Sequence, residues 1–209
     1  MPHAAAAQML DLWSLCEDVV VEFGTSGELV LKGRLGTERI DRPDPVVREA
    51  LRRMELGPVL LANVRARRAA DDAEAGAHLV LRPVLRRLSH LVVRTLGMDD
   101  LKGPLLSVSP RTQHARFAPV PLPARCRLRM PSEVSLKLED AGIALESATS
   151  PHRVVLHRPE AAWVVGTLAW PVTPDAAAAA LPLPPGVTES VLGYLAAAGM
   201  AAPVGRAEG

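Results

Sequence analysis

The sequence predicts an α+β fold of tandem winged-helix-like modules, in which a three-stranded antiparallel sheet and three helices occur twice. Residues 21–45, "VEFGTSGELVLKGRLGTERIDRPDP", share their order of strands, turns and helix start with residues 136–160, "LKLEDAGIALESATSPHRVVLHRPE". Three positions correspond at nearly constant spacing: Gly27 with Gly142, Ile40 with Leu156, and Pro58 with Pro171. A content of 48% hydrophobic and 22% charged residues is typical of a chain that folds around a core.

The first module begins with the strands "DVVVEF" and "ELVLKG" around "GTSG", a turn whose glycines tolerate positive φ. "TERID" is the third strand. Asp44 is a helix cap with Pro45 at the first helical position, and "VVREALRRM" continues that helix with apolar residues at helical spacing. "VLLANV" adds a short element, and Leu12 and Trp13 begin a short N-terminal helix.

The third helix of this module is expected within "GAHLVLRPVLRRLSHLVVRTLG". Pro83 predicts either that the regular part runs from Pro83 to Leu96 or that the helix is kinked at this proline. Residues 65–76 before it are charged and alanine-rich, and we expect either a mobile loop or a frayed helix there. "PLLSVSP" is an extra strand that closes the module.

The second module has the strands "EVSLKLE" and "GIALESA" around Asp140-Ala141-Gly142, followed by "HRVVLH". Its helices are "RPEAAWVVGTLA", "AAAAAL" after the cap Thr173, and "GVTESVLGYLAAAGM". The predicted organisation is therefore a first module over residues 1–110, a proline-rich linker over 111–130, a second module over 131–202 and a disordered tail over 203–209.

Composition and charge argue against several classes of protein. The net charge of +1 lacks the basic excess of a duplex-DNA binder, and 3% aromatic residues are too few for base-stacking platforms. No apolar run reaches the length of a membrane span, and the N-terminus lacks the pattern of a secretory signal. We therefore expect a cytoplasmic protein with no nucleic acid or membrane partner, in which Cys16 and Cys126 are free thiols.

No catalytic, cofactor-binding or metal-binding residue is assigned from the sequence. His152 and His157 point to opposite faces of one strand, and His78 and His90 lie on different sides of the expected helix, so neither pair suits one metal ion. "GTSGEL" joins two hairpin strands and therefore differs from a nucleophile elbow, which joins a strand to a helix. No glycine-rich phosphate loop is found.

The segments "VREALRRMELGPVLLANV" and "RVVLHRPEAAWVVGTLAWPVTP" carry a family resemblance. From about Leu12 to Met200 the chain resembles the N-terminal half of SagB/ThcOx-type azoline dehydrogenases, flavoenzymes that oxidise thiazolines and oxazolines to azoles in ribosomally made peptides. In that family this half looks like two peptide-clamp modules similar to the RiPP precursor recognition element. A flavin domain follows it there but not here, so we expect no enzymatic activity, with FMN held by a partner chain.

A winged-helix-like unit has its third strand beside its third helix, and a peptide can add to the free strand edge. Leader peptides of this class are often acidic, which would suit arginines along such a groove. The expected peptide-binding residues are Glu38, Arg39, Ile40, Arg82, Leu85 and Arg86 in the first module and Val154 and Leu156 in the second. The expected partner interface is Trp170, Val191, Tyr194 and Leu195, with Trp163 in the core and Trp170 either in the core or exposed as an anchor.

The leading hypothesis is a non-catalytic subunit that recognises a precursor (leader) peptide during thiazole and oxazole formation in RiPP biosynthesis, such as that of a thiopeptide. It would work with a separate flavin dehydrogenase or cyclodehydratase. One alternative is a tandem winged-helix DNA-binding regulator, and another is a structural protein that dimerises through its apolar third helix. Which groove binds the peptide and whether the chain is a homodimer stay open.

Overall fold

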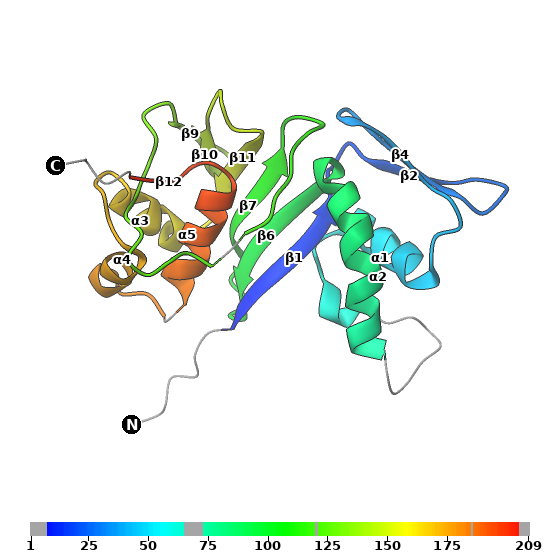
Figure 1. Cartoon of the computed structure of the whole chain (residues 1–209), viewed down its shortest axis with the longest axis horizontal. Helices are drawn as coiled ribbons and strands as arrows, with labels where there is room; N and C mark the ends of the chain where they lie inside the picture. The colour runs from blue at the N-terminus through cyan, green and yellow to red at the C-terminus, as the bar shows by residue number, and fades with distance from the viewer. Residues whose placement is uncertain (1–7, 65–72, 120, 185, 205–209) are drawn as a thin grey trace. The chain divides into compact units, whose positions relative to one another are not determined.

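The computed structural model describes residues 8–64, 73–119, 121–184 and 186–204 and divides into two compact units, which are described separately (Figure 1). The C-terminal unit comprises Met1–Leu10, Leu96–Val108 and Phe117–Gly209, and the N-terminal unit comprises Asp11–Thr95 and Ser109–Arg116. Both combine helices with mainly antiparallel strands, so the α+β class is confirmed. The division differs from the expected one, because Leu96–Val108 group with the second half of the chain.

The N-terminal unit contains the three-stranded antiparallel sheet that the sequence predicts. Its strands are β2 (Val20–Phe23), β3 (Leu29–Gly33) and β4 (Gly36–Ile40), in that spatial order. Helix α1 (Pro45–Leu56) follows, and its predicted cap is present because Asp44 Oδ1 accepts a hydrogen bond of 2.8 Å from the Val46 amide. The apolar face of α1 packs in one core with β3 and β4.

A second group of strands has the order β5-β1-β6, in which β1 from Asp11 onwards and β6 up to Thr95 belong to this unit. β1 (Met9–Leu15) pairs with β5 (Val59–Leu60), and a short 3₁₀ turn, η1 (Leu61–Asn63), follows β5. The prediction of an N-terminal helix at Leu12 and Trp13 is therefore wrong. These two residues lie in β1 opposite Leu60 and Val59, so strand pairing decides their conformation.

The predicted third helix of the first module starts too late and ends too late. α2 (Ala73–Arg87) contains Pro83 inside it and ends at Arg87, and a 3₁₀ turn, η2 (Ser89–Leu91), leads into the strand β6 (Val92–Met98). Most of β6 is buried, and its adjacent valines favour a strand over a helix. Residues 65–72, part of the segment expected to be a loop or frayed helix, lie outside the described residues.

The C-terminal unit also follows the predicted order of three strands and three helices. β9 (Ser135–Glu139), β10 (Gly142–Glu146) and β11 (His152–Leu156) are antiparallel. The helices are α3 (Pro159–Thr167), α4 (Pro174–Ala180), capped by the side chain of Thr173, and α5 (Val187–Ala197). No helix in the described ranges is long and apolar enough to cross a membrane.

The strand β7 (Pro104–Pro110) pairs with β11, so the order of strands in this unit is β6-β7-β11-β10-β9. The predicted strand "PLLSVSP" is thus present, but the expectation that it closes the first module is wrong, because it pairs with β11 and Leu96–Val108 group with the C-terminal unit. The amide of His157, just after β11, donates a 2.9 Å hydrogen bond to the carbonyl of Leu105. Because β10 and β7 take its two sides, β11 has no free edge.

One core joins these strands to α3 and α5, and α5 is buried along most of its length. A small sheet of β8 (Leu128–Arg129) and β12 (Ala202–Pro203) lies at the margin of this unit. The linker expected over residues 111–130 therefore contains a strand, and the tail expected from residue 203 begins with a strand residue. Residues 205–209 of that tail lie outside the described residues.

His152 is an unusual member of this core. Its ring is almost fully buried and lies edge-on to Phe117, with 5.6 Å between the ring centroids, and Phe117 in turn contacts Tyr194. Neither ring nitrogen has a hydrogen-bond partner in the described structure. Burial lowers the pKa of His152 below its usual 6.5, because the charged ring would lose its hydration there.

This burial predicts that the protein is less stable in acid. The unfolded chain binds a proton at His152 once the pH falls below about 6.5, whereas the folded chain keeps the ring neutral to lower pH. The stability contributed by the neutral ring is therefore complete above that pH and is lost as the pH falls below it. Between neutral and mildly acidic pH, the free energy of unfolding measured with urea should fall less in His152→Phe than in the wild type. An equal fall in both proteins would contradict the prediction.

Two turn glycines that correspond in the sequence predict unequal effects on stability. Gly142 has φ +133°, and a Cβ there would lie 2.0 Å from the carbonyl oxygen of Leu156, whereas Gly27 has φ +84° and open space around it. Gly27→Ala should cost about 1–2 kcal/mol from backbone conformation alone. Gly142→Ala should lower the free energy of unfolding by clearly more, and equal losses in thermal unfolding would contradict this geometry.

Candidate functional site

The open edge of β4 is the first feature of the candidate site. Gly33 pairs with Gly36 across a two-residue turn, so this pair carries the ladder hydrogen bonds that close the hairpin. Hydrogen-bonded and non-hydrogen-bonded pairs alternate in an antiparallel ladder, which directs the backbone groups of Thr37 and Arg39 away from β3. Among the described strands, only β3 pairs with β4, so these groups face an unoccupied edge.

Arg87, the last residue of α2, contacts this edge. Its Nη2 donates a hydrogen bond to the backbone oxygen of Arg39, and its Nε lies 3.1 Å from Oε2 of Glu38. The contact with Arg39 agrees with the outward direction of that carbonyl. A carbonyl oxygen has two lone pairs, so the Arg39 oxygen can accept a further hydrogen bond while Arg87 stays in place.

His90 in η2 lies close to β4. Its Nε2 is 3.8 Å from Oε1 of Glu38, and its buried Nδ1 has no hydrogen-bond partner in the described part of the chain. Burial lowers the pKa of His90, and the nearby Glu38 carboxylate acts in the opposite direction. Gly36 has φ +140°, a backbone conformation that favours glycine, and a Cβ there would make an ordinary contact of 3.4 Å with His90 Nε2.

Arg39 differs in its ion pairing from Arg82 and Arg86, two exposed arginines of α2. The Arg39 side chain is already ion-paired, 3.0 Å from Asp41 and 3.6 Å from Glu28. Arg82 and Arg86 are four residues apart on one face of α2, and both are exposed. Neither has an ion-pair partner among the residues that the structure describes. These two guanidinium groups are therefore the ones available to an anionic ligand.

Four of the residues expected to bind peptide are buried in the cores instead: Ile40, Leu85, Val154 and Leu156. Ile40 and Leu85 still contribute to the candidate site, because they anchor β4 and α2 in the core beneath it. The expectation of a second groove along His152–Leu156 is wrong, because β7 already pairs with that edge of β11. Glu38, Arg39, Arg82 and Arg86 remain at the surface or partly exposed.

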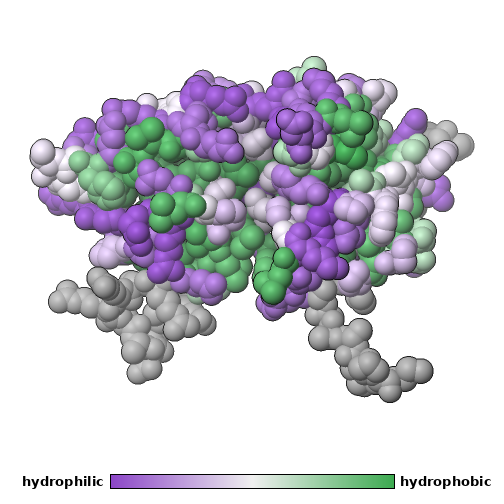
Figure 2. Space-filling model, turned by 180° about the vertical axis from the view of Figure 1, so that it is seen from behind, coloured by the Kyte–Doolittle hydropathy of each residue, from purple (hydrophilic) through white to green (hydrophobic). Residues whose placement is uncertain are grey.

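The expected partner interface is largely wrong because most of its residues are buried. Val191, Tyr194 and Leu195 are buried in α5, so the predicted dimer surface on this helix does not exist. Trp170 is 73% exposed, which agrees with the alternative of a surface anchor, whereas Trp163 is 47% exposed and lies outside the core where it was expected. Hydrophobic residues reach the surface in several patches between hydrophilic ones (Figure 2).

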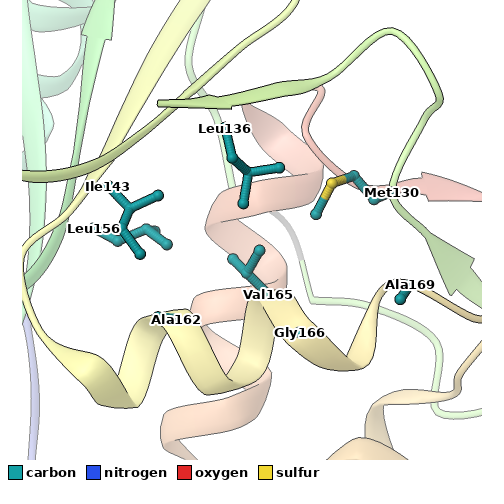
Figure 3. A pocket seen from close by; sticks show the side chains of 8 residues that line it. All are labelled: Met130, Leu136, Ile143, Leu156, Ala162, Val165, Gly166 and Ala169. Atoms are coloured by element: carbon teal, nitrogen blue, oxygen red, sulfur yellow. The ribbon is translucent and has the colours of Figure 1, made fainter. Parts of the chain in front are cut away.

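The C-terminal unit has an apolar pocket of about 310 Å³ between the β9–β10 hairpin and α3 (Figure 3). Leu136 points across it towards Val165 of α3, with Ile143 and Met130 on opposite sides. The pocket lining offers almost no polar surface and therefore suits an apolar side chain or packing surface better than a charged ligand. Its eight lining residues are Met130, Leu136, Ile143, Leu156, Ala162, Val165, Gly166 and Ala169.

The sequence placed Arg87 and Arg94 with Arg82 and Arg86 on the expected groove helix, but Arg87 was not assigned to the site and His90 was not expected near β4. The error followed from extending the helix to Leu96, which put Arg87 in mid-helix and His90 on the helix surface. The adjacent valines Val92 and Val93 were the signal that could have ended the helix earlier. Arg94, also assigned to that helix, is buried in β6, where it pairs with Asp11 and lies 3.4 Å from the ring centroid of Trp13.

Within the described part of the chain, no group of three or more His, Cys, Asp or Glu residues is placed to hold a metal ion. No known protein-family model matches this chain, and no curated protein matches it either.

Arg87→Met should loosen β4 with little effect on global stability. The pair with Glu38 is half-exposed, and exposed ion pairs contribute less than about 1 kcal/mol. Hydrogen exchange measured by mass spectrometry should speed up in the peptide that contains residues 36–40, because the helix no longer holds the strand. Arg86→Met is the matched control, and equal exchange in both variants would show that Arg87 does not hold the edge.

Proposed function

We propose that this chain is a non-catalytic recognition subunit that binds an extended, acidic precursor peptide as an added strand along β4. On this proposal the peptide is the substrate of azole formation. A separate flavin dehydrogenase, with FMN, or a cyclodehydratase performs the chemistry, and the complex works in the cytoplasm. The observation that carries the proposal is that β4 has an edge with which no described strand pairs, next to a helix whose exposed Arg82 and Arg86 have no ion-pair partner among the described residues.

The order of elements supports two winged-helix-like modules in tandem. In each unit a three-stranded antiparallel sheet is followed by a helix that starts at a proline, Pro45 or Pro159, and a later helix packs in the same core. The two modules differ at the third strand, because β11 is paired on both sides and β4 on one. The N-terminal module is therefore the one proposed to take a guest peptide.

The backbone of β4 supplies the binding energy that the proposal needs. Thr37 and Arg39 present outward N–H and C=O groups, which match the hydrogen-bonding groups of an extended peptide. Such bonds do not depend on the side chains of the guest, so the strand edge alone gives little sequence preference. Selectivity then comes from the residues that flank the edge.

The flanking charge favours an acidic guest. Arg82 and Arg86 on α2 are exposed, and Arg87 stands at the edge itself with its charge partly compensated by Glu38. Charge-assisted hydrogen bonds from guanidinium to carboxylate are roughly twice as strong as neutral ones. A subunit that holds the peptide near a catalytic partner raises the effective concentration of the substrate without doing chemistry itself.

The proposal predicts that Thr37→Pro abolishes peptide binding while Thr37→Ala does not. The Thr37 amide faces outward, so proline removes a donor for the guest but none of the bonds between β3 and β4. The measurement is fluorescence anisotropy of a labelled acidic leader peptide, titrated with the full chain. Circular dichroism of each variant checks that it folds.

The arginines give a second readout in the same titration. Arg82→Glu with Arg86→Glu should weaken binding of an acidic peptide by about tenfold or more, as each lost charge-assisted contact is worth about 1.5–3 kcal/mol. Arg48→Glu, an exposed arginine on α1, is the control and should leave binding nearly unchanged. The proposed function would be refuted if all these variants kept the saturable binding of the wild type. It would also be refuted if the wild type showed no saturable binding, with or without its partner enzymes.

A further inference from the structure

The strand β9 is an open edge of the C-terminal unit. It ends the strand order of that unit, and β10 is the only described strand that pairs with it. All five of its residues are exposed. An exposed strand edge with hydrophobic side chains is a template for pairing with another chain unless something covers it.

The outward backbone groups of β9 belong to its two leucines. Glu139 pairs with Gly142 across a two-residue turn, so this pair carries ladder hydrogen bonds and the next pair, Leu138 with Ile143, does not. By the same alternation, the N–H and C=O groups of Leu136 and Leu138 point away from β10. Their side chains are 52% and 86% exposed. Leu136 lines the apolar pocket (Figure 3), and Leu138, two residues further on, points to the same face of the hairpin.

The opposite face of β9 carries charges of both signs. Lys137 Nζ lies 3.0 Å from Oε2 of Glu146, and Glu139 is paired with Arg153, which also contacts Glu146. Lys137 and Glu139 are two residues apart and therefore point the same way from the strand. Along one edge, the strand thus presents a positive and a negative side chain on one face and two leucines on the other.

We propose that β9 pairs antiparallel with β9 of a second copy of this chain, with Leu138 of each copy on the two-fold axis. Residues with outward backbone groups must face each other, which leaves three registers, centred on residue 136, 137 or 138. Centring on Leu138 puts Lys137 opposite Glu139 of the second copy, twice, by symmetry. Centring on Lys137 puts the two lysines opposite each other, and centring on Leu136 puts each lysine opposite Ser135.

The charge pattern therefore selects both the partner and the register. Opposite charges directly across an antiparallel pair are stabilising and like charges are destabilising, so only the register centred on Leu138 gains from both charged residues. An isologous two-fold contact needs a surface that complements itself, and β9 meets that condition with its own sequence. The pairing also covers Leu138, the more exposed of the two leucines, with Leu138 of the second copy.

The test is the oligomeric state of the full chain, measured by sedimentation velocity over a range of concentrations. The wild type should form dimers, and Leu138→Lys should weaken dimerisation by at least about tenfold, because it places two like charges at the axis. Leu101→Lys replaces a leucine that is 99% exposed in the same unit and should change nothing. Thermal unfolding of each variant confirms that it is folded.

A charge exchange tests the register. Lys137→Glu puts only acidic residues across the proposed contact, and Glu139→Lys puts only lysines there, so each variant alone should be mainly monomeric. An equimolar mixture should form a heterodimer, because opposite charges then face each other again. A monomeric wild type, dimers that survive Leu138→Lys, or a mixture that stays monomeric would overturn the proposal, and none of these outcomes bears on peptide binding at β4.

Discussion

The pairing of strand edges is the constraint on which the rest of this structure depends. A strand leaves half of its backbone groups without partners on any side where no other strand lies. In the C-terminal unit β7 takes that position beside β11, and the hydrogen bond from His157 to Leu105 fixes the end of the pair. In the N-terminal unit no described strand does the same for β4, and a single arginine, Arg87, reaches its edge.

This difference separates two sheets that share their order of elements. With β7 in place, Val154 and Leu156 become core residues between the strands and the helices α3 and α5. Beside β4, by contrast, α2 keeps an exposed face with Arg82 and Arg86, and only its opposite face is buried. Similar patterns of sequence have thus produced one sheet whose third strand, β11, is paired on both sides and one whose third strand, β4, is paired with a described strand on one side.

Charged side chains at the β4 and β9 edges form ion pairs with nearby groups. Glu38, Arg39 and Arg87 are tied to β4 by ion pairs with neighbouring groups, and Lys137, Glu139 and Arg153 form a paired set on the β9–β10 hairpin. With a net charge of only +1, long-range attraction contributes little to any association. What these surfaces can recognise depends on a few side chains at each strand edge.

The sequence by itself determined the hairpins, the capped starts of α1 and α4, and the class of the fold, because turn glycines, prolines and capping side chains act over a few residues. It also indicated β4 and α2 as neighbours through the order of elements. It did not determine that residues 92–98 form a strand, nor that α5 is buried, because an apolar run fits a buried helix or a buried strand equally well. Only the tertiary structure decided which edges are occupied, since β7 reaches β11 from a segment about fifty residues away and no local pattern records that contact.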